Sequence, residues 1–130
     1  MIFDSDVLIW FLRGDPEAAA LVDSEREGSV SIVSVIEVLQ GAKSNREMKE
    51  FNDYLRKRAL QIVPLSATIG DLAATLMEEH ALSTGIEFAD ALIAATARET
   101  GQTLATGNVR HFRSIPRLHL KPFRPKRQLR

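Results

Sequence analysis

The sequence predicts an α/β fold on a mainly parallel central sheet of about four to five short strands. Short segments rich in apolar and β-branched residues recur along the chain, and segments with helical periodicity lie between them. Strands that alternate with helices are typical of parallel sheets, because each helix returns the chain to the edge where the next strand begins. We therefore expect three layers, in which helices cover both faces of the sheet.

Five segments have the composition of strands. All are short and largely apolar, as is typical of strands that are buried on both faces of a sheet. We expect strands at residues 1–3, 29–33, 60–65 and 103–106, and an edge strand within residues 118–123.

Helix signals fill the intervals between these strands. Asp15 and Pro16 are typical of an N-cap and a first helical turn, and they predict a helix that runs to residue 27. Ser34 and Glu37 match a capping box and predict a helix over residues 34–43. Further helices are expected over residues 46–58, 66–82 and 89–101, and residues 107–112 are expected to form a turn.

Length and composition indicate a single globular domain. The chain has 130 residues, of which 45% are apolar, and this is enough for an ordinary hydrophobic core. It has no cysteine, which excludes disulfides and thiolate metal ligands. The first residues lack a basic start, acids interrupt the first apolar run, and no apolar run is long enough to cross a bilayer. We therefore expect a cytoplasmic protein without a signal peptide or a membrane partner.

Charge is distributed unevenly along a chain whose formal net charge is zero. All 17 acidic residues lie in residues 1–99, whereas residues 100–130 contain only basic and uncharged residues. Such a basic end indicates either a polyanionic partner or a solvated segment that aids solubility. We expect residues 1–123 to form the folded domain and residues 124–130 to form a flexible basic tail.

Acidic residues follow the expected strands at one edge of the sheet. Asp4 and Asp6 come directly after the first strand, and Glu37 lies in the first turn of the helix that follows the second strand. Asp90 lies at the start of a helix that is too apolar for the surface. Sites in parallel α/β sheets form outside the carboxyl ends of the strands, so we expect these carboxylates to converge there.

A divalent cation would explain why several carboxylates share one place. Clustered carboxylates repel one another and raise one another's pKa, and a bound cation removes this conflict. Oxygen ligands suit Mg²⁺ or Mn²⁺, which polarise phosphoryl oxygens and promote the ionisation of water. Thr106 and Asn108 follow the fourth strand at the same edge. An acidic centre with a basic margin is the pattern expected of a metal-dependent nuclease.

Three of these acids also have a purely structural interpretation. Glu37 could only complete its capping box, Asp90 could only stabilise the positive end of its helix, and Asp6 could cap the segment that follows it. Asp4 is harder to explain in this way, because apolar residues on both sides leave it little contact with water.

Four segments resemble the motifs of PIN-domain proteins. DSDVLIWFLRGDP, which begins at Asp4, resembles the opening motif, and SIVSVIEVLQGA resembles the second, with Glu37 just inside a helix. FADALIAATA, which contains Asp90, resembles the third motif, and LATGNVRHFRSIPRLHL resembles the fourth. The motifs occur in order from Asp4 to about Leu120. The most similar subgroup is that of the VapC-like toxins of bacterial and archaeal toxin–antitoxin modules.

This resemblance implies a three-layer α/β/α PIN-like fold and a Mg²⁺- or Mn²⁺-dependent endoribonuclease that acts on tRNA, rRNA or mRNA. It also implies a homodimer, and inhibition by a small cognate antitoxin that covers or enters the active cleft. Position by position, Asp4, Glu37 and Asp90 match the three acids that carry catalysis and metal binding in the family.

The resemblance also suggests roles for residues around these three acids. Asn108 stands where many relatives have Asp, which leaves the site one charge less acidic. The further assignments are Asp6 and Asn108 as outer or water-mediated ligands, Ser5 and Thr106 as supporting residues, and Arg110, Arg113 and Arg117 as RNA contacts.

Two other functions stay open at this stage. The opening IFDSDVLI is also similar to that of haloacid-dehalogenase-type phosphatases, in which Asp4 would be a covalent nucleophile and Asp6 a general acid. A PIN domain that binds RNA or protein without cleaving is the second alternative.

Several residues near the motifs have two interpretations. Glu87 is either an outer acid of the site or a solvated loop residue, and we favour the latter. His111 could contact RNA or act as an acid, but packing or surface exposure is the simpler role. Trp10 and Phe11 are expected in the core, with an antitoxin or dimer surface as the alternative.

Overall fold

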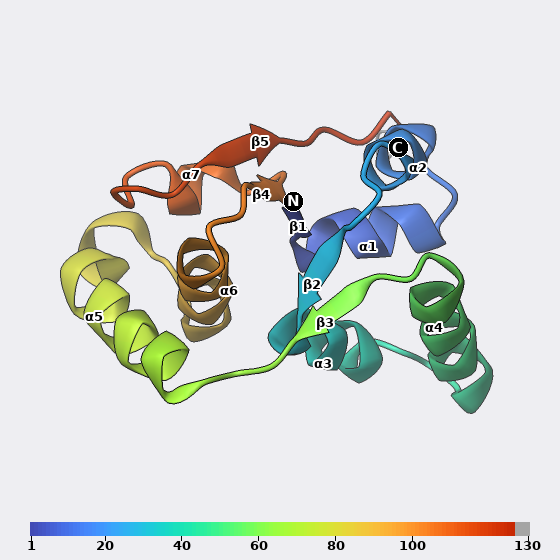
Figure 1. Ribbon diagram of the computed structural model, residues 1–130, viewed down its shortest axis with the longest axis horizontal. Coiled ribbons are helices and arrows are strands. Elements are labelled where there is room, and N and C mark those ends of the chain that lie inside the picture. Colours follow the sequence, from blue (N-terminus) through green and yellow to red (C-terminus); the bar gives the residue numbers. More distant parts are fainter. Residues whose placement is uncertain (127–130) are drawn as a thin grey trace.

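A five-stranded sheet forms the centre of the molecule (Figure 1). The structure is a computed structural model and describes residues 1–126. The strand order is β3-β2-β1-β4-β5, and every neighbouring pair is parallel. The strands are β1 (Ile2–Phe3), β2 (Ser29–Ser31), β3 (Gln61–Val63), β4 (Leu104–Thr106) and β5 (Leu120–Pro122). The expected α/β fold with a parallel sheet is confirmed.

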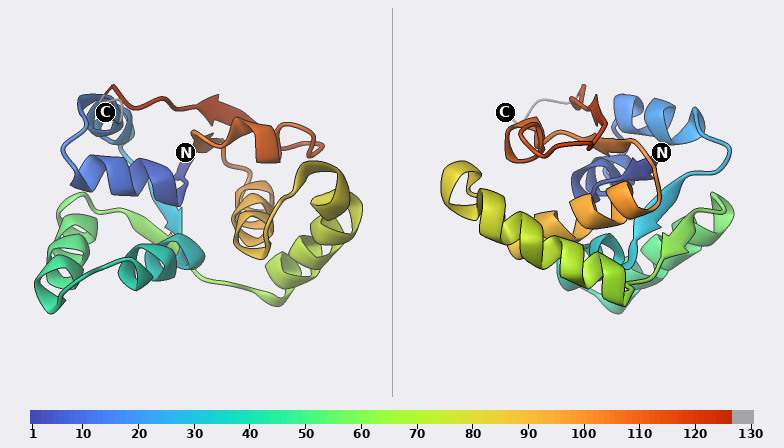
Figure 2. Two further views of the ribbon diagram at one scale, coloured as in Figure 1. Left: turned by 180° about the vertical axis from the view of Figure 1, so that it is seen from behind. Right: turned by 60° about the vertical axis from the view of Figure 1, so that its left-hand side comes forward.

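Helices cover both faces of the sheet, as the two views of Figure 2 show. Successive residues of a strand point to opposite faces, so Ile2 packs in a core with residues of α5 and α6, whereas Phe3 packs with residues of α1, α2 and α4. The helices are α1 (Ser5–Leu12), α2 (Pro16–Asp23), α3 (Ile32–Gln40), α4 (Asn45–Lys57), α5 (Ala67–Thr84), α6 (Phe88–Glu99) and α7 (Val109–Phe112).

The order of the strands determines where the site forms. Strand β1 lies between β2 and β4, with Ile2 opposite both Ser29 and Leu104. The segments that leave these three strands at their carboxyl ends therefore start side by side. They are the start of α1, the start of α3 and the loop before α7.

The start of α3 differs from the sequence-based expectation. The strand ends at Ser31, and the Ser31 hydroxyl accepts a hydrogen bond from the backbone N–H of Val33 at 3.0 Å. Ser31 is therefore the N-cap, and the capping box expected between Ser34 and Glu37 does not form. Ser34 lies inside the helix, fully buried, and its hydroxyl has no hydrogen-bond partner within residues 1–126. The β-branched residues after Ser31 suit a strand as well as a helix, so the earlier cap was not evident from the sequence.

Two further boundaries were wrong in the sequence-based expectation. Helix α2 ends at Asp23 instead of residue 27, with Ser24 as its C-cap and Val22 as its last buried residue. Residues 109–112, expected as part of a turn, form the short helix α7, and fully buried Phe112 anchors it in the core.

The expected division after residue 123 stays a proposal. Phe123 is buried in the core, whereas Arg124 and Lys126 are exposed. The rest of the expected basic tail, residues 127–130, lies outside the described residues. Within residues 1–126, none of the helices combines the length and apolar character needed to cross a bilayer.

Candidate active site

Asp4 is the most deeply buried acid of the site. It is the N-cap of α1, directly after β1, and only 6% of it is exposed. Its Oδ1 atom accepts a hydrogen bond from the backbone N–H of Ser5 at 2.8 Å, and its Oδ2 atom accepts one from the Thr106 hydroxyl at 2.7 Å. Both carboxylate oxygens are thus held in place, and the second bond ties β1 to the end of β4.

Asp6 connects the first turn of α1 to the loop after β4. Its Oδ1 atom accepts the backbone N–H of Val7, and its Oδ2 atom accepts the backbone N–H of Gly107, both at 2.8 Å. A Cβ atom on Gly107 would lie 2.7 Å from Asp6 Oδ2 and 3.1 Å from the backbone oxygen of Phe123, so any other residue would displace the Asp6 carboxylate from this hydrogen bond. Our sequence reasoning missed Gly107 as a site residue, although a glycine directly after the fourth strand was the available signal.

Glu37 reaches the site from α3. It lies on an exposed part of the helix, and its Oε1 atom accepts a hydrogen bond from the Ser5 hydroxyl at 2.6 Å. Ser5 therefore links two of the expected acids, because its backbone N–H binds Asp4 while its side chain binds Glu37.

Asp90 lies in the first turn of α6, at the third position of the helix. Its Oδ2 atom accepts the backbone N–H of Glu87 at 3.2 Å and lies 3.1 Å from Nδ1 of His111. The same imidazole nitrogen lies 2.7 Å from the side-chain amide of Asn108. Glu87 is exposed and forms the N-cap of α6, in agreement with the solvated interpretation.

The acids influence one another electrostatically. Burial is the main cause that raises the pKa of Asp4 to about 7, and repulsion by the charge of Asp6 raises it further. The hydrogen bonds from Thr106 and Ser5 lower this pKa, and the charge of Asp90 raises it. Burial also raises the pKa of Asp6, against the lowering effect of its backbone hydrogen bonds.

The donor set fits a hard divalent cation that keeps part of its water shell. All candidate ligands are oxygens, as Mg²⁺ and Mn²⁺ prefer, and the buried, mutually repelling carboxylates gain from a bound positive charge. Within residues 1–126, however, no three acidic or histidine side chains form a ready-made metal-binding group. The expected direct ligation by Asp4, Glu37 and Asp90 is therefore not preformed, since Glu37 is bonded to Ser5 and Asp90 contacts His111.

Two other groups of residues singled out in the sequence lie on α1 and on the segment that follows β4. Arg110 in α7 and the following Arg113 and Arg117 are exposed, on the segment that leaves β4. The Phe11 ring stacks on the Tyr54 ring with 4.2 Å between centroids, and the Arg13 guanidinium lies 5.3 Å from the centre of the Trp10 ring. Phe11 and Trp10 thus contribute to packing around α1.

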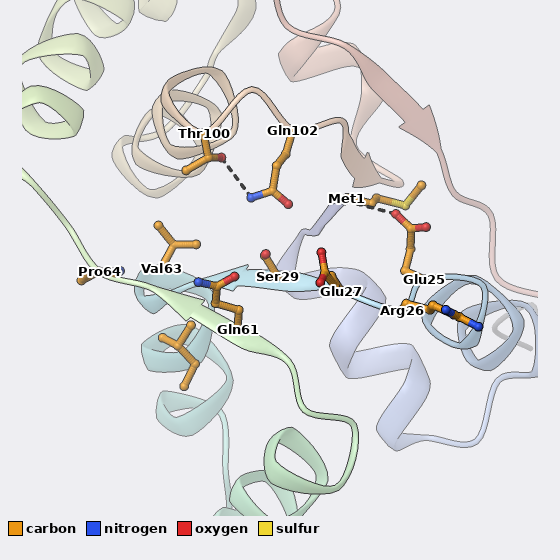
Figure 3. A pocket seen from close by; sticks show the side chains of 11 residues that line it. Met1, Glu25, Arg26, Glu27, Ser29, Gln61, Val63, Pro64, Thr100 and Gln102 are labelled. Carbon is orange, nitrogen blue, oxygen red and sulfur yellow. Dashed lines mark hydrogen bonds and ion pairs between the residues drawn. The ribbon is translucent and has the colours of Figure 1, made fainter.

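A wide cavity is formed by residues around the starts of β1, β2 and β3 and by the chain before β4 (Figure 3). Its volume is about 770 Å³; Met1, Ser29, Gln61 and Gln102, which begin or precede strands, line it together with Val63 at the end of β3. None of the expected site acids lines it. The acids instead occupy the edge at which parallel α/β sheets form their sites.

Fold and site together define a parallel α/β protein that carries its carboxylates at the carboxyl ends of its strands. The family model of the PIN domain matches residues 1–118, and the chain belongs to the PIN-domain family. The chain is 35% identical over 116 residues to "Ribonuclease VapC10" of Mycobacterium tuberculosis, and the matched region covers 86% of this chain and 85% of that protein.

Solved structures share this fold. A toxin-antitoxin complex from Klebsiella pneumoniae matches with a TM-score of 0.77 and 26% identity, over 90% of this chain and 93% of that chain. VapBC2 from Rickettsia felis, bound to a DNA fragment from its promoter, matches with a TM-score of 0.81 and 22% identity, over 95% of this chain and 100% of that chain. The resemblance to VapC-like PIN proteins is confirmed.

The family match removes the haloacid-dehalogenase alternative.

We expect Asp4 to make the metal-free protein less stable as the pH rises. Its pKa is about 7 in the folded chain and 3.8 in its ordinary state, so the folded chain binds more protons between these values. The free energy of unfolding should therefore fall as the pH rises from about 4 to 7. Asp4→Asn removes the charge that causes this loss of stability. The variant should therefore be more stable than the parent at pH 8, by up to about 4 kcal/mol.

Urea unfolding in EDTA at several pH values measures this difference. The Asn side chain can still accept the Ser5 N–H and donate to the Thr106 hydroxyl, so the local bonds are kept. Asp71→Asn, at an exposed position of α5, is the matched control. A stability difference between Asp4→Asn and the parent that does not change with pH would contradict the assignment.

Proposed function

We propose that this chain is a Mg²⁺- or Mn²⁺-dependent endoribonuclease that hydrolyses RNA phosphodiester bonds, and the toxin of a toxin–antitoxin system. The observation that carries the proposal is the buried, hydrogen-bonded Asp4 carboxylate, which shares one edge of the sheet with Asp6, Asp90 and Glu37. The names of the M. tuberculosis ribonuclease and of the K. pneumoniae toxin-antitoxin complex support the same function. Its substrate would be tRNA, rRNA or mRNA in the cytoplasm.

The chain's own residues have distinct tasks in this proposal. Asp4, Glu37 and Asp90 hold the cation, with Asp6 and Asn108 in outer or water-mediated positions. When bound, such a cation supplies positive charge to the phosphate oxygens and promotes the ionisation of the attacking water. The supporting residues are Ser5, which orients Glu37, and Thr106, which orients Asp4.

The exposed arginines around α7 provide the basic margin. Arg110, Arg113 and Arg117 belong to the acid-free part of the sequence and follow the strand that ends at the site. Contacts from such side chains to phosphates position an RNA backbone without reading its sequence. We assign these arginines to RNA binding. Replacing them should therefore change KM and the dependence of KM on salt concentration.

We expect the purified chain, freed of any partner, to cleave RNA with Mg²⁺ or Mn²⁺ and to stop on addition of EDTA. Asp4→Asn and Asp90→Asn should each lower kcat by about 100-fold or more, because each removes a charge that holds the cation. Gel analysis of a defined tRNA and end mapping of total RNA are the measurements.

Two controls separate chemistry from binding. Asp71→Asn should cleave like the parent, and a combined replacement of Arg110 and Arg113 by Ala should raise KM with little change in kcat. Intact RNA in the presence of Mn²⁺, together with retained RNA binding, would favour a non-cleaving PIN domain.

We propose that the cognate antitoxin binds the groove between α1, α3 and α4. Its volume is about 490 Å³, and the Leu12 and Met48 side chains in it are 41% and 38% exposed although both are apolar. Glu37 is one of its lining residues, so a segment in the groove would also cover a residue of the site. The charged residues of the groove are Arg13, Glu37, Lys43, Glu47 and Glu50.

Leu12→Asp combined with Met48→Asp should weaken antitoxin binding at least about tenfold, because each places a charge against an apolar segment of the partner. The RNA cleavage of this variant should persist when the antitoxin is present. The probe is the product of a short reading frame beside this one, measured by titration calorimetry and by inhibition of cleavage. Parent-like inhibition of the variant would exclude this groove.

We also propose a homodimer. Ile36 and Phe88 are exposed apolar side chains, 56% and 72% respectively, and each stands within two residues of a site acid. A second copy that covers them would bring two sites together, and a monomeric mass by light scattering would exclude it.

A further inference from the structure

A continuous hydrogen-bonded path joins Asp4 to Asp90 across the site. The Thr106 hydroxyl donates to Asp4 at 2.7 Å and accepts the backbone N–H of Asn108 at 3.0 Å. The Asn108 side-chain amide lies 2.7 Å from Nδ1 of His111, and that nitrogen lies 3.1 Å from Oδ2 of Asp90. We propose that His111 is a positioning residue, which fixes the Asp90 carboxylate relative to Asp4 through its Nδ1 atom. This inference rests on the proposed nuclease function.

The fold holds His111 in a defined place. The residue lies in α7, where its backbone N–H donates to the Asn108 carbonyl at 3.1 Å. The next residue, Phe112, is fully buried in the same core as Ile93 and Ala94 of α6. Helix α7 is therefore attached to the helix that carries Asp90, and the imidazole is half-buried between them. A side chain placed in this way loses little conformational entropy when it binds the carboxylate.

Hydrogen-bond chemistry indicates which group donates. A carboxylate only accepts, so Nδ1 must carry a hydrogen to bind Asp90. The amide oxygen and nitrogen of Asn108 can exchange places by rotation of the amide, which brings Oδ1 toward the same hydrogen. One Nδ1–H then serves both Asp90 and Asn108, and no two donors face each other. In this arrangement Nδ1 is occupied within the site, and Nε2 is the nitrogen left for other partners.

This arrangement gives Asn108 a different task from that of a fourth acid. Its backbone N–H binds Thr106, and its side chain binds His111, so both ends of the residue belong to the path. A carboxylate at this position would add a negative charge close to Asp90 and compete with it for the imidazole hydrogen. Asn108 and His111 therefore hold Asp90 in place together. In this proposal the main role of Asn108 is its hydrogen bond with His111, and its role as an outer ligand comes second.

The rival role for His111 is a direct contact with RNA, and it would use the other ring nitrogen. The Asn side chain places a hydrogen-bonding atom near the position of Nδ1, whereas the longer Gln side chain places one near Nε2. His111→Asn and His111→Gln thus form a matched pair, and His111→Leu retains bulk without any hydrogen bond. The three variants distinguish positioning of Asp90 from contact with substrate.

We expect His111→Asn to keep most of the kcat of the parent. His111→Gln and His111→Leu should lose about 10–100-fold in kcat with little change in the KM for RNA, as is typical when a partner of a metal-binding side chain is removed. The reverse order, in which Gln is active and Asn raises KM, would overturn the proposal in favour of an RNA contact. Equal activity of all three variants and the parent would also overturn it.

Metal binding provides a readout that does not depend on cleavage. We would measure Tm at increasing Mn²⁺ concentrations. The Mn²⁺ concentration that gives half of the maximal rise in Tm should be similar for the parent and His111→Asn. His111→Gln should need about 10–100-fold more Mn²⁺. If the parent binds Mn²⁺ but cleaves no RNA, the nuclease function fails while the role of His111 is still tested. Should His111→Leu not fold, the Asn and Gln variants still decide the result, and equal Mn²⁺ midpoints for these two would overturn the proposal.

Discussion

The hydrogen bond between the Thr106 hydroxyl and the buried Asp4 carboxylate is the contact on which the site depends. It joins residues that are 102 positions apart in the chain, and it can form only because β1 and β4 are neighbours in the sheet. Asp4 is also the N-cap of α1, so the same carboxylate fixes the direction in which that helix leaves the sheet. The geometry of the acids is therefore a consequence of strand order.

Burial of this carboxylate carries a cost that ordinary packing would avoid. The pKa of Asp4 rises to about 7 because the charged form loses water and faces Asp6. We expect an amide side chain at this position, which keeps these hydrogen bonds without the charge, to make a more stable apoprotein, so stability does not explain the acid. The divalent cation that we propose would explain it, since the desolvated negative charge that destabilises the apoprotein would strengthen cation binding. The loss of stability in the apoprotein and the proposed binding of the cation thus both follow from the burial of the Asp4 carboxylate.

The sequence predicted the fold and the shared edge better than it predicted the contacts there. Alternating strands and helices indicated the parallel sheet, and the rule about strand ends placed Asp4 and Asp90 at one edge. The predicted start of α3 was wrong because Ser31 and Ser34 are both possible N-caps, and only packing distinguishes them. The roles of Gly107 and His111 depend on distances across the chain, to Asp6 and Asp90, which local patterns do not contain.

Anomalous diffraction from crystals grown with Mn²⁺ tests the central claim most directly, because it locates the metal without reference to activity. We expect the strongest anomalous peak beside the carboxylates of Asp4 and Asp90, at the carboxyl ends of the strands. A fully occupied Mn²⁺ near Glu25 and Glu27, in the cavity of about 770 Å³, with none at the acids, would contradict the claim.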